Sequence, residues 1–153
     1  MIFITLGSQK FQFNRLLKAV DELNLKEEIF AQIGYSDYIP KNFKYKRFMD
    51  RNEFSSYINK SDVIITHGGT GAIMGALKKG KKVIAVPRLS EYGEHVDDHQ
   101  LQIIEEFKEL NLLYSCEDMD IEKALNIVKI KDFKKYKSNT ETIINSIENF
   151  IGD

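Results

Sequence analysis

The sequence contains a single cysteine, Cys116, among its 153 residues, and no tryptophan. One cysteine cannot form an internal disulfide or build a metal site by itself, and it suits a reducing compartment. We expect Cys116 to be a small, buried, apolar residue. The sequence also lacks any apolar run of about 18 residues, and its apolar opening, MIFITLG, is too short for a signal peptide. We therefore expect a soluble, cytoplasmic protein that reaches a membrane only peripherally, through a partner.

An excess of charge is also missing, because the formal net charge is −1. Nucleic acid is therefore not an expected partner. The exception is local: residues 41–47, KNFKYKR, and Arg51 form a basic cluster. The favoured interpretation is a half-buried strand at a sheet edge, where lysines prevent pairing with other chains. Contact with an anionic membrane surface or partner is the alternative.

Strand-like and helix-like segments alternate along the chain. The strand-like runs are MIFITLG (1–7), EIFAQIG (28–34), FKYKRF (43–48), DVIIT (62–66), KKVIAVP (81–87) and NLLYSC (111–116). The helix-like runs are 13–24, 52–61, 72–80, 97–110 and most of a tail over about 118–153. This alternation predicts one α/β domain over 1–153, with a doubly wound, Rossmann-like parallel sheet.

The sequence also predicts where two of these helices begin or end and which face of a third is buried. The helix at 52–61 is expected to begin at a cap formed by Asn52 or Asp50. Gly80 is expected to end the helix that follows the run DVIIT. In the helix at 97–110, apolar residues recur every three positions and predict its buried face. These residues are Leu101, Ile104, Phe107 and Leu110.

Glycines are concentrated between the run DVIIT and the next helix, in the sequence HGGTG (67–71). Ligands in doubly wound sheets bind beyond the carboxyl ends of the strands, where free N–H groups at a helix N-terminus attract anions. Glycines would let a phosphate approach these N–H groups, and Thr70 would add a hydroxyl donor. The alternative is a tight turn that allows close packing of helix and sheet. The residues alone leave both interpretations open.

Two nucleotide-binding motifs are nearly matched here. A dinucleotide fingerprint needs a third small residue where Met74 stands, and a P-loop needs Ser or Thr where Lys82 stands. A hydride-transfer enzyme and an ATPase are therefore not supported.

A second polar segment, EYGEHVDDHQ (91–100), follows the next predicted strand and should border the same edge of the sheet. Its hydrogen-bonding groups, including Glu94, His95, His99 and Gln100, suit the hydroxyls of a sugar. Capping could instead explain Asp97 and Gln100, which have the D-x-x-Q spacing of a capping box. His95 and His99 lack a convincing third ligand, so we expect no metal.

Residues 67–103, HGGTGAIMGALKKGKKVIAVPRLSEYGEHVDDHQLQI, together with the threonine before them, resemble the donor-binding segment of GT-B glycosyltransferases. They are similar to the C-terminal domain of family 28, which includes MurG-like peptidoglycan N-acetylglucosaminyltransferases. They are also similar to the small catalytic subunits of two-chain bacterial capsule and exopolysaccharide glycosyltransferases. The opening TLGSQKFQFNRLLKAVDEL (5–23) matches the start of the same domain.

This resemblance implies a UDP-sugar site without a cofactor or metal. Gly68 to Gly71 would hold the diphosphate with His67 beside it, and His99 and Gln100 would contact the donor sugar. Gly7 and Ser8 match a glycine turn that faces the cleft between lobes. The implied donor-binding residues are His67, Gly68, Gly69, Thr70, Gly71, Glu94, His95, His99 and Gln100. Gly75 departs from the family, since many relatives carry there a glutamate that binds the ribose.

A complete GT-B enzyme has two such lobes, so the resemblance implies that this chain is the donor lobe alone. The expected activity is inverting transfer of a hexose, galactose or N-acetylglucosamine, from UDP to a lipid-linked saccharide. A separate, membrane-attached subunit would supply the acceptor side, and the isolated chain could form a homodimer. Alternatives are a non-catalytic nucleotide-sugar-binding module and, less well matched in length, a UDP-sugar 2-epimerase. The general base is not assigned.

Overall fold

The structure, a computed structural model, describes residues 1–135. Within these residues six parallel strands form one sheet, in the order β3-β2-β1-β4-β5-β6. The strands are β1 (Ile2–Thr5), β2 (Ile29–Gln32), β3 (Lys44–Lys46), β4 (Val63–Thr66), β5 (Lys82–Ala85) and β6 (Tyr114–Ser115). The order reverses between β1 and β4, as in doubly wound proteins. The predicted fold class is confirmed, while the helical tail predicted beyond residue 135 lies outside the described residues.

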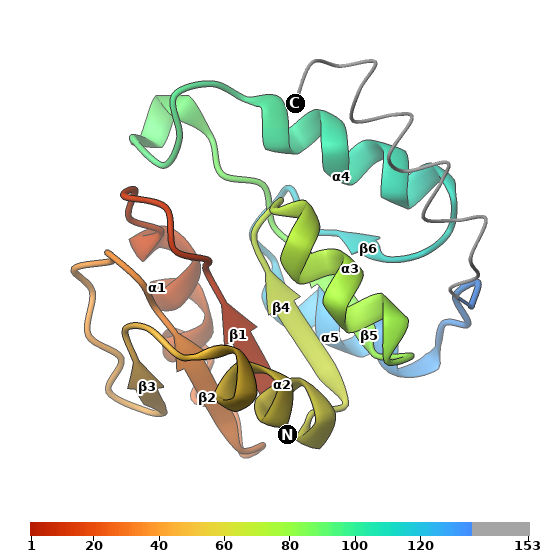
Figure 1. The fold of residues 1–153 in the computed structure, drawn as a ribbon, viewed down its shortest axis with the longest axis horizontal. Coiled ribbons are helices and arrows are strands. Elements are labelled where there is room, and N and C mark those ends of the chain that lie inside the picture. Colours follow the sequence, from red (N-terminus) through yellow and green to blue (C-terminus); the bar gives the residue numbers. More distant parts are fainter. Residues whose placement is uncertain (136–153) are drawn as a thin grey trace.

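Helices cover both faces of this sheet (Figure 1). They are α1 (Asn14–Leu23), α2 (Arg51–Lys60), α3 (Thr70–Lys78), α4 (His99–Glu109) and α5 (Ile121–Ile130), with a 3₁₀ turn, η1, at Ser90–Tyr92. Buried residues of α1 and α5 pack on one face, and those of α2, α3 and α4 pack on the other.

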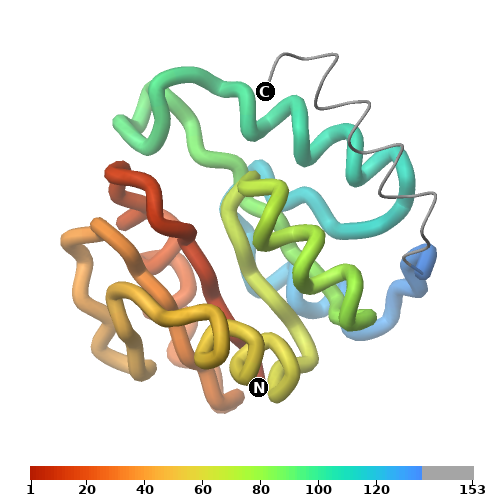
Figure 2. The backbone as a smooth tube through the Cα atoms, in the orientation of Figure 1, coloured from red at the N-terminus to blue at the C-terminus, as the bar shows by residue number. Residues whose placement is uncertain are grey.

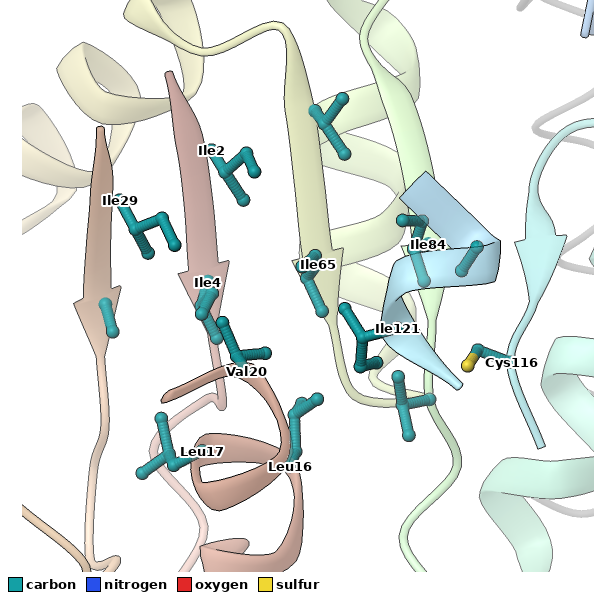
Figure 3. Packing of buried hydrophobic residues seen from close by; sticks show 14 of the residues in the cluster. Ile2, Ile4, Leu16, Leu17, Val20, Ile29, Ile65, Ile84, Cys116 and Ile121 are labelled. Atoms are coloured by element: carbon teal, nitrogen blue, oxygen red, sulfur yellow. The ribbon is translucent and has the colours of Figure 1, made fainter. Parts of the chain in front are cut away.

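Successive strand residues point to opposite faces, so each central strand must be apolar along its whole length. On β1, Ile2 and Ile4 join the cluster with α1 and α5, whereas Phe3 joins the opposite cluster. Figure 3 shows Ile4 close to Val20 of α1, with Ile65 on the neighbouring strand β4 and Ile84 on β5 beyond it. Cys116 belongs to the same cluster, and burial raises the pKa of its thiol to about 12. The prediction of a buried, apolar role for this residue is confirmed.

Strand pairing places the functional segments at one edge of the sheet. Thr5 at the end of β1 pairs with Thr66 at the end of β4, so Gly7 and His67 leave the sheet side by side. The loop after β1 and the segment that enters α3 accordingly rise from adjacent strands (Figure 2).

The structure corrects the predicted burial of two elements. Strand β3 is the edge strand, as predicted, but it is not half-buried, because all three of its residues are exposed. On α4, Leu101 and Leu110 are only partly buried, and Ile103 joins Ile104 and Phe107 in the core. A strict three-residue spacing drifts around a helix of 3.6 residues per turn, so its outermost members leave the buried face.

The helix boundaries follow the local sequence. Of the two candidate caps for α2, Asp50 is the N-cap, and its carboxylate accepts a hydrogen bond from the N–H of Glu53 at 2.8 Å. Gly80 has φ +69° and follows the C-cap of α3, so it ends that helix in the left-handed conformation, as predicted. No helix within residues 1–135 has the length and apolar character needed to cross a membrane.

Candidate functional site

A pocket of about 490 Å³ opens at the carboxyl ends of β1, β2 and β4. Five of the predicted site residues line it: Gly7, Ser8, His67, Gly69 and Gly71. The loop between β3 and α2 forms the opposite wall, and sequence reasoning did not assign that loop to the site. The further lining residues are Thr5, Gln9, Gln32, Phe48, Met49, Asp50, Arg51, Phe54 and Ala72. The sequence did contain one indication of this wall. The loop between β3 and α2 follows the carboxyl end of a predicted strand, which is where ligands bind in such sheets.

Three of the glycines in this region are required by close packing. A Cβ atom on Gly7 would lie 2.6 Å from Nε2 of His67, and a Cβ on Gly69 would overlap the same ring. A Cβ on Gly68 would lie 2.5 Å from Cβ of Gln100. The His67 ring and Gln100 are therefore the groups that approach this backbone.

Gly71 is different, because a Cβ atom there would have no heavy atom within 4 Å. It lies in the first turn of α3, and the N-cap residue, Gly69, has no side chain to cap that turn. The first N–H groups of an α-helix have no intrahelical acceptor. An anion in the pocket could therefore reach the N–H groups at Gly71 and Ala72 without displacing a side chain. Close packing explains the glycines before α3, and open space remains at Gly71.

His67 is a buried, neutral histidine at the end of β4. Only 4% of it is exposed, and burial lowers its pKa to about 3, with further lowering by the positive charge of Arg88 and by His95. His67 therefore carries no charge at neutral pH and would meet an anionic ligand as a hydrogen-bonding group.

The pKa of His67 predicts an acid-sensitive fold. The unfolded chain takes up a proton near pH 6.5 and the folded chain only near pH 3, so stability is retained above pH 6.5 and lost as pH falls below it. Between pH 7.5 and 5 we expect the free energy of unfolding to fall by about 2 kcal/mol. Urea denaturation at several pH values measures this change. His67→Asn should flatten the profile in that window. An unaltered profile in His67→Asn would contradict the assignment.

Gln100 does not take part in a capping box, which corrects one of the sequence interpretations. The N-cap of α4 is Asp98, without a side-chain bond, and the carboxylate of Asp97 accepts from the N–H of His99 at 2.9 Å. The amide of Gln100 instead contacts the two residues that follow β4. Its Oε1 accepts from the N–H of Gly68 at 3.3 Å, and its Nε2 lies 3.3 Å from Nδ1 of His67.

The remaining predicted residues lie around the pocket without lining it. Thr70 is the first residue of α3. His95 lies with its ring 5.6 Å from that of Phe11 and its Nδ1 3.2 Å from the carboxylate of Asp97. His99 is the partly buried first residue of α4. The segment 95–99 therefore lies near the loop after β1, through the contact of His95 with Phe11. None of its residues lines the pocket.

Glu94 is a buried structural anion in this arrangement. It is 1% exposed, and Nε and Nη2 of Arg15 donate to its two carboxylate oxygens at 3.0 and 2.9 Å. The N–H of Leu89 donates to the same carboxylate at 3.0 Å. These three donors all come from the protein itself. Through its pairing with Arg15, the Glu94 carboxylate connects the loop after β5 to α1.

Arg88, which the sequence interpretation did not select, fastens the same region. It is 1% exposed, and its guanidinium donates to Leu6 O at 2.6 Å and to Phe11 O and Gln12 O at 3.1 Å. Burial lowers its pKa to about 10, and the charge of Glu94 acts in the opposite direction. Arg88 therefore holds the loop that carries Gly7 and Ser8. An arginine directly after the apolar run VIAVP was the only signal in the sequence.

Comparisons with known proteins agree with this geometry. Residues 1–151 match the glycosyltransferase family 28 C-terminal domain. The UDP-N-acetylglucosamine transferase subunit ALG13 of Candida glabrata is 30% identical over 123 residues, which are 77% of this chain and 58% of that protein. Human ALG13 is 26% identical over 126 residues, which are 75% of this chain and 11% of the human protein. The chain thus spans less than two thirds of the length of either relative.

Solved structures share the fold. An NMR structure of ALG13 aligns with a TM-score of 0.60 at 21% identity, covering 88% of this chain and 87% of that one. The Acinetobacter baumannii MurG structure aligns with a TM-score of 0.55 at 16% identity, covering 95% of this chain and 49% of that one.

Both of these sequence relatives are eukaryotic ALG13 subunits, so they give no support to the capsule or exopolysaccharide context that the sequence resemblance implied. They agree with the wider resemblance to family 28 and to GT-B glycosyltransferases. A match over nearly the whole chain, together with a doubly wound sheet that has its pocket at the carboxyl ends of the strands, shows that the chain belongs to the glycosyltransferase family 28 C-terminal domain family.

Proposed function

We propose that this chain is the donor-binding subunit of a UDP-sugar-dependent glycosyltransferase. The diphosphate would bind at the N-terminus of α3, in the pocket bordered by the loop after β1. Among possible donors we favour UDP-N-acetylglucosamine, because the ALG13 relatives are UDP-N-acetylglucosamine transferase subunits. UDP-galactose is the second candidate.

The observation that carries this proposal is the open first turn of α3. Gly69 leaves the turn uncapped, and Gly71 borders the pocket with empty space where a side chain would stand. Free N–H groups and the partial positive charge of the helix dipole favour a diphosphate at this position. The same groups would stabilise the diphosphate as it leaves the sugar, so the reaction needs no metal for this purpose.

The loop between β3 and α2 suits the nucleoside. Phe48, Met49 and Phe54 give the pocket an apolar wall, and Phe48 is 46% exposed, so its ring is accessible to a base. Gln32 lies deeper, but its amide donates to Gly7 O and Arg47 O and accepts from Thr5. We therefore assign Gln32 to holding the pocket together and the aromatic wall to base stacking.

The acceptor side is proposed to come from a separate, membrane-attached subunit that presents a lipid-linked saccharide. The relatives' description as subunits supports this assignment. Sugar transfer with inversion needs a general base, which we place on the partner. The chain would then act in the cytoplasm, at the membrane surface through that partner. Gly75, which cannot bind ribose with a side chain, favours a second candidate: a nucleotide-sugar-binding module without transferase activity.

The test is calorimetric titration of the chain with UDP, UDP-N-acetylglucosamine and UDP-galactose in the absence of metal. Wild-type chain should bind with a 1:1 stoichiometry, and Gly71→Val should lose roughly 100-fold or more in affinity because its side chain occupies the phosphate position. The open space around Gly71 means that the variant should keep its fold, which urea denaturation checks.

Gly71→Ala, which adds one methyl group at the same position, serves as the graded control and should bind with intermediate affinity. Absence of binding in the wild-type chain, both alone and with its partner subunit, would contradict the proposal. Full turnover by the isolated chain would contradict the assignment of the acceptor side to a partner. Binding of UDP-sugar without any transfer in the assembled complex would favour the non-catalytic module.

A further inference from the structure

Gln100 is placed to control which nitrogen of His67 carries the proton. The N–H of Gly68 can only donate, so the Gln100 atom that faces it at 3.3 Å is the carbonyl oxygen, Oε1. The other end of the amide, the NH₂ group, must then face Nδ1 of His67, which lies 3.3 Å away. Because the amide can only donate at this end, Nδ1 must accept. The proton of the neutral ring is left on Nε2.

Nε2 of His67 lies where a ligand would reach it. It sits in a notch between two glycines, since Cβ atoms added to Gly7 and Gly69 would lie 2.6 and 2.7 Å from it. His67, Gly7 and Gly69 all line the pocket. Among residues 1–135 the structure gives Nε2 no hydrogen-bond partner, although only 4% of the residue is exposed. Nε2 is not among the fully buried polar atoms that lack a partner, so it is open to the pocket, where a ligand oxygen can accept its proton.

We propose that Gln100 is a positioning residue that holds His67 in the Nε2–H tautomer, so that a neutral imidazole donates a hydrogen bond to an anionic oxygen of the ligand. This inference rests on the proposed function, because the anionic oxygen belongs to the diphosphate bound at α3. This role is separate from the sugar contact that the family resemblance implied for Gln100. One end of its amide contacts Gly68 and the other contacts His67, so Gln100 can act on the ligand through His67.

A neutral donor suits this position better than a cation. The Arg88 charge and deep burial both keep the ring of His67 uncharged. An uncharged donor whose tautomer is already fixed loses no proton and needs no rearrangement when the diphosphate binds. The three glycines around it serve the same end, because side chains at Gly7 or Gly69 would cover Nε2 and one at Gly68 would displace Gln100.

The decisive variant is Gln100→Glu, which keeps the shape of the side chain and exchanges the amide for a carboxylate. A carboxylate can still accept from Gly68, but it can only accept from His67 as well, so a proton must move to Nδ1. Long-range ¹H–¹⁵N spectra of the histidine side chains distinguish the two tautomers. In the free wild-type chain we expect His67 to carry its proton on Nε2, and in Gln100→Glu we expect a proton on Nδ1. Gln102→Glu, on an exposed residue of the same helix, is the matched control and should leave His67 unchanged.

UDP affinity gives the second readout. Gln100→Met, which removes both amide contacts without adding charge, should release the tautomer and weaken UDP binding roughly 10-fold. Gln100→Glu should weaken it further, roughly 100-fold, because the ring nitrogen facing the pocket becomes an acceptor and a negative charge is added. Circular dichroism and urea denaturation check that each variant is folded, so that its UDP affinity can be compared with that of the wild-type chain.

The outcomes separate this inference from the proposed function. A proton on Nδ1 in the free wild-type chain, or an Nε2–H tautomer that persists in Gln100→Glu, would overturn the role of Gln100 even if UDP binds. Unchanged UDP affinity in Gln100→Met would also overturn it. Tautomers that change as expected in a chain that does not bind UDP would support the positioning role and contradict the proposed function alone.

Discussion

Gly69→Ala is expected to lower the free energy of unfolding by about 3 kcal/mol. Its Cβ atom would overlap Cε1 of His67 and lie 2.7 Å from Nε2. The ring cannot move away, because it is buried and Nδ1 is held by Gln100. A forced methyl group in such a site must displace the ring or the start of α3. Urea denaturation at pH 7.5 measures the loss.

Gly71→Ala is the matched control for this prediction. The same methyl group two residues further along meets no atom within 4 Å, so stability should be unchanged or slightly higher, since alanine favours helix formation. Equal losses in the two variants would show that the glycines serve backbone flexibility, and the packing account would then be wrong. A Gly69→Ala chain as stable as the wild type would also contradict the packing account.

Arg88→Met is expected to cost at least about 3 kcal/mol of stability and to weaken UDP binding as well. The buried guanidinium serves the carbonyl oxygens of Leu6, Phe11 and Gln12, and methionine would leave them without a donor. Each buried polar group without a partner costs roughly 1–3 kcal/mol, although such costs do not add fully. The loop after β1 would then lose its anchor, and the pocket wall at Gly7 and Ser8 would lose its position.

Arg47→Met provides the comparison for Arg88→Met. Arg47 also donates to two backbone carbonyls, those of Gly34 and Ser36, but it is exposed, so water can replace it. Its replacement should cost less than about 1 kcal/mol. Urea denaturation and UDP titration of both variants provide the measurements. Similar small effects at the two arginines would contradict the anchoring role of Arg88.

The fold was readable from the sequence because its signals are local. The continuous apolar run Val63–Thr66 predicts a strand covered on both faces, and Gly80 marks the end of the following helix. The two wrong predictions concern burial, which a short sequence pattern does not determine. Alternation in FKYKRF could not reveal that all three residues of strand β3 are exposed, and a three-residue spacing could not identify the buried face of α4 over several turns.

The candidate site was only partly readable, because its key contacts join distant residues. The glycines in HGGTG were correctly placed at a helix N-terminus, but the crowding of Gly68 by Gln100, 32 residues away, depends on how the start of α4 packs against the segment between β4 and α3. Spacing suggested a cap at Asp97 and Gln100 instead. Likewise, the acidic Glu94 invited a role in sugar binding, whereas the folded chain pairs it with Arg15, which precedes it by 79 residues.

The central claim is that UDP binds at the open first turn of α3. Backbone amide NMR of the ¹⁵N-labelled chain during titration with UDP tests it most directly. The account predicts that the largest shifts occur at Thr70, Gly71 and Ala72, with smaller shifts at Gly7 and Ser8, and that Gly71→Val abolishes them. Largest shifts at residues remote from this pocket, with the α3 amides unmoved, would contradict the account.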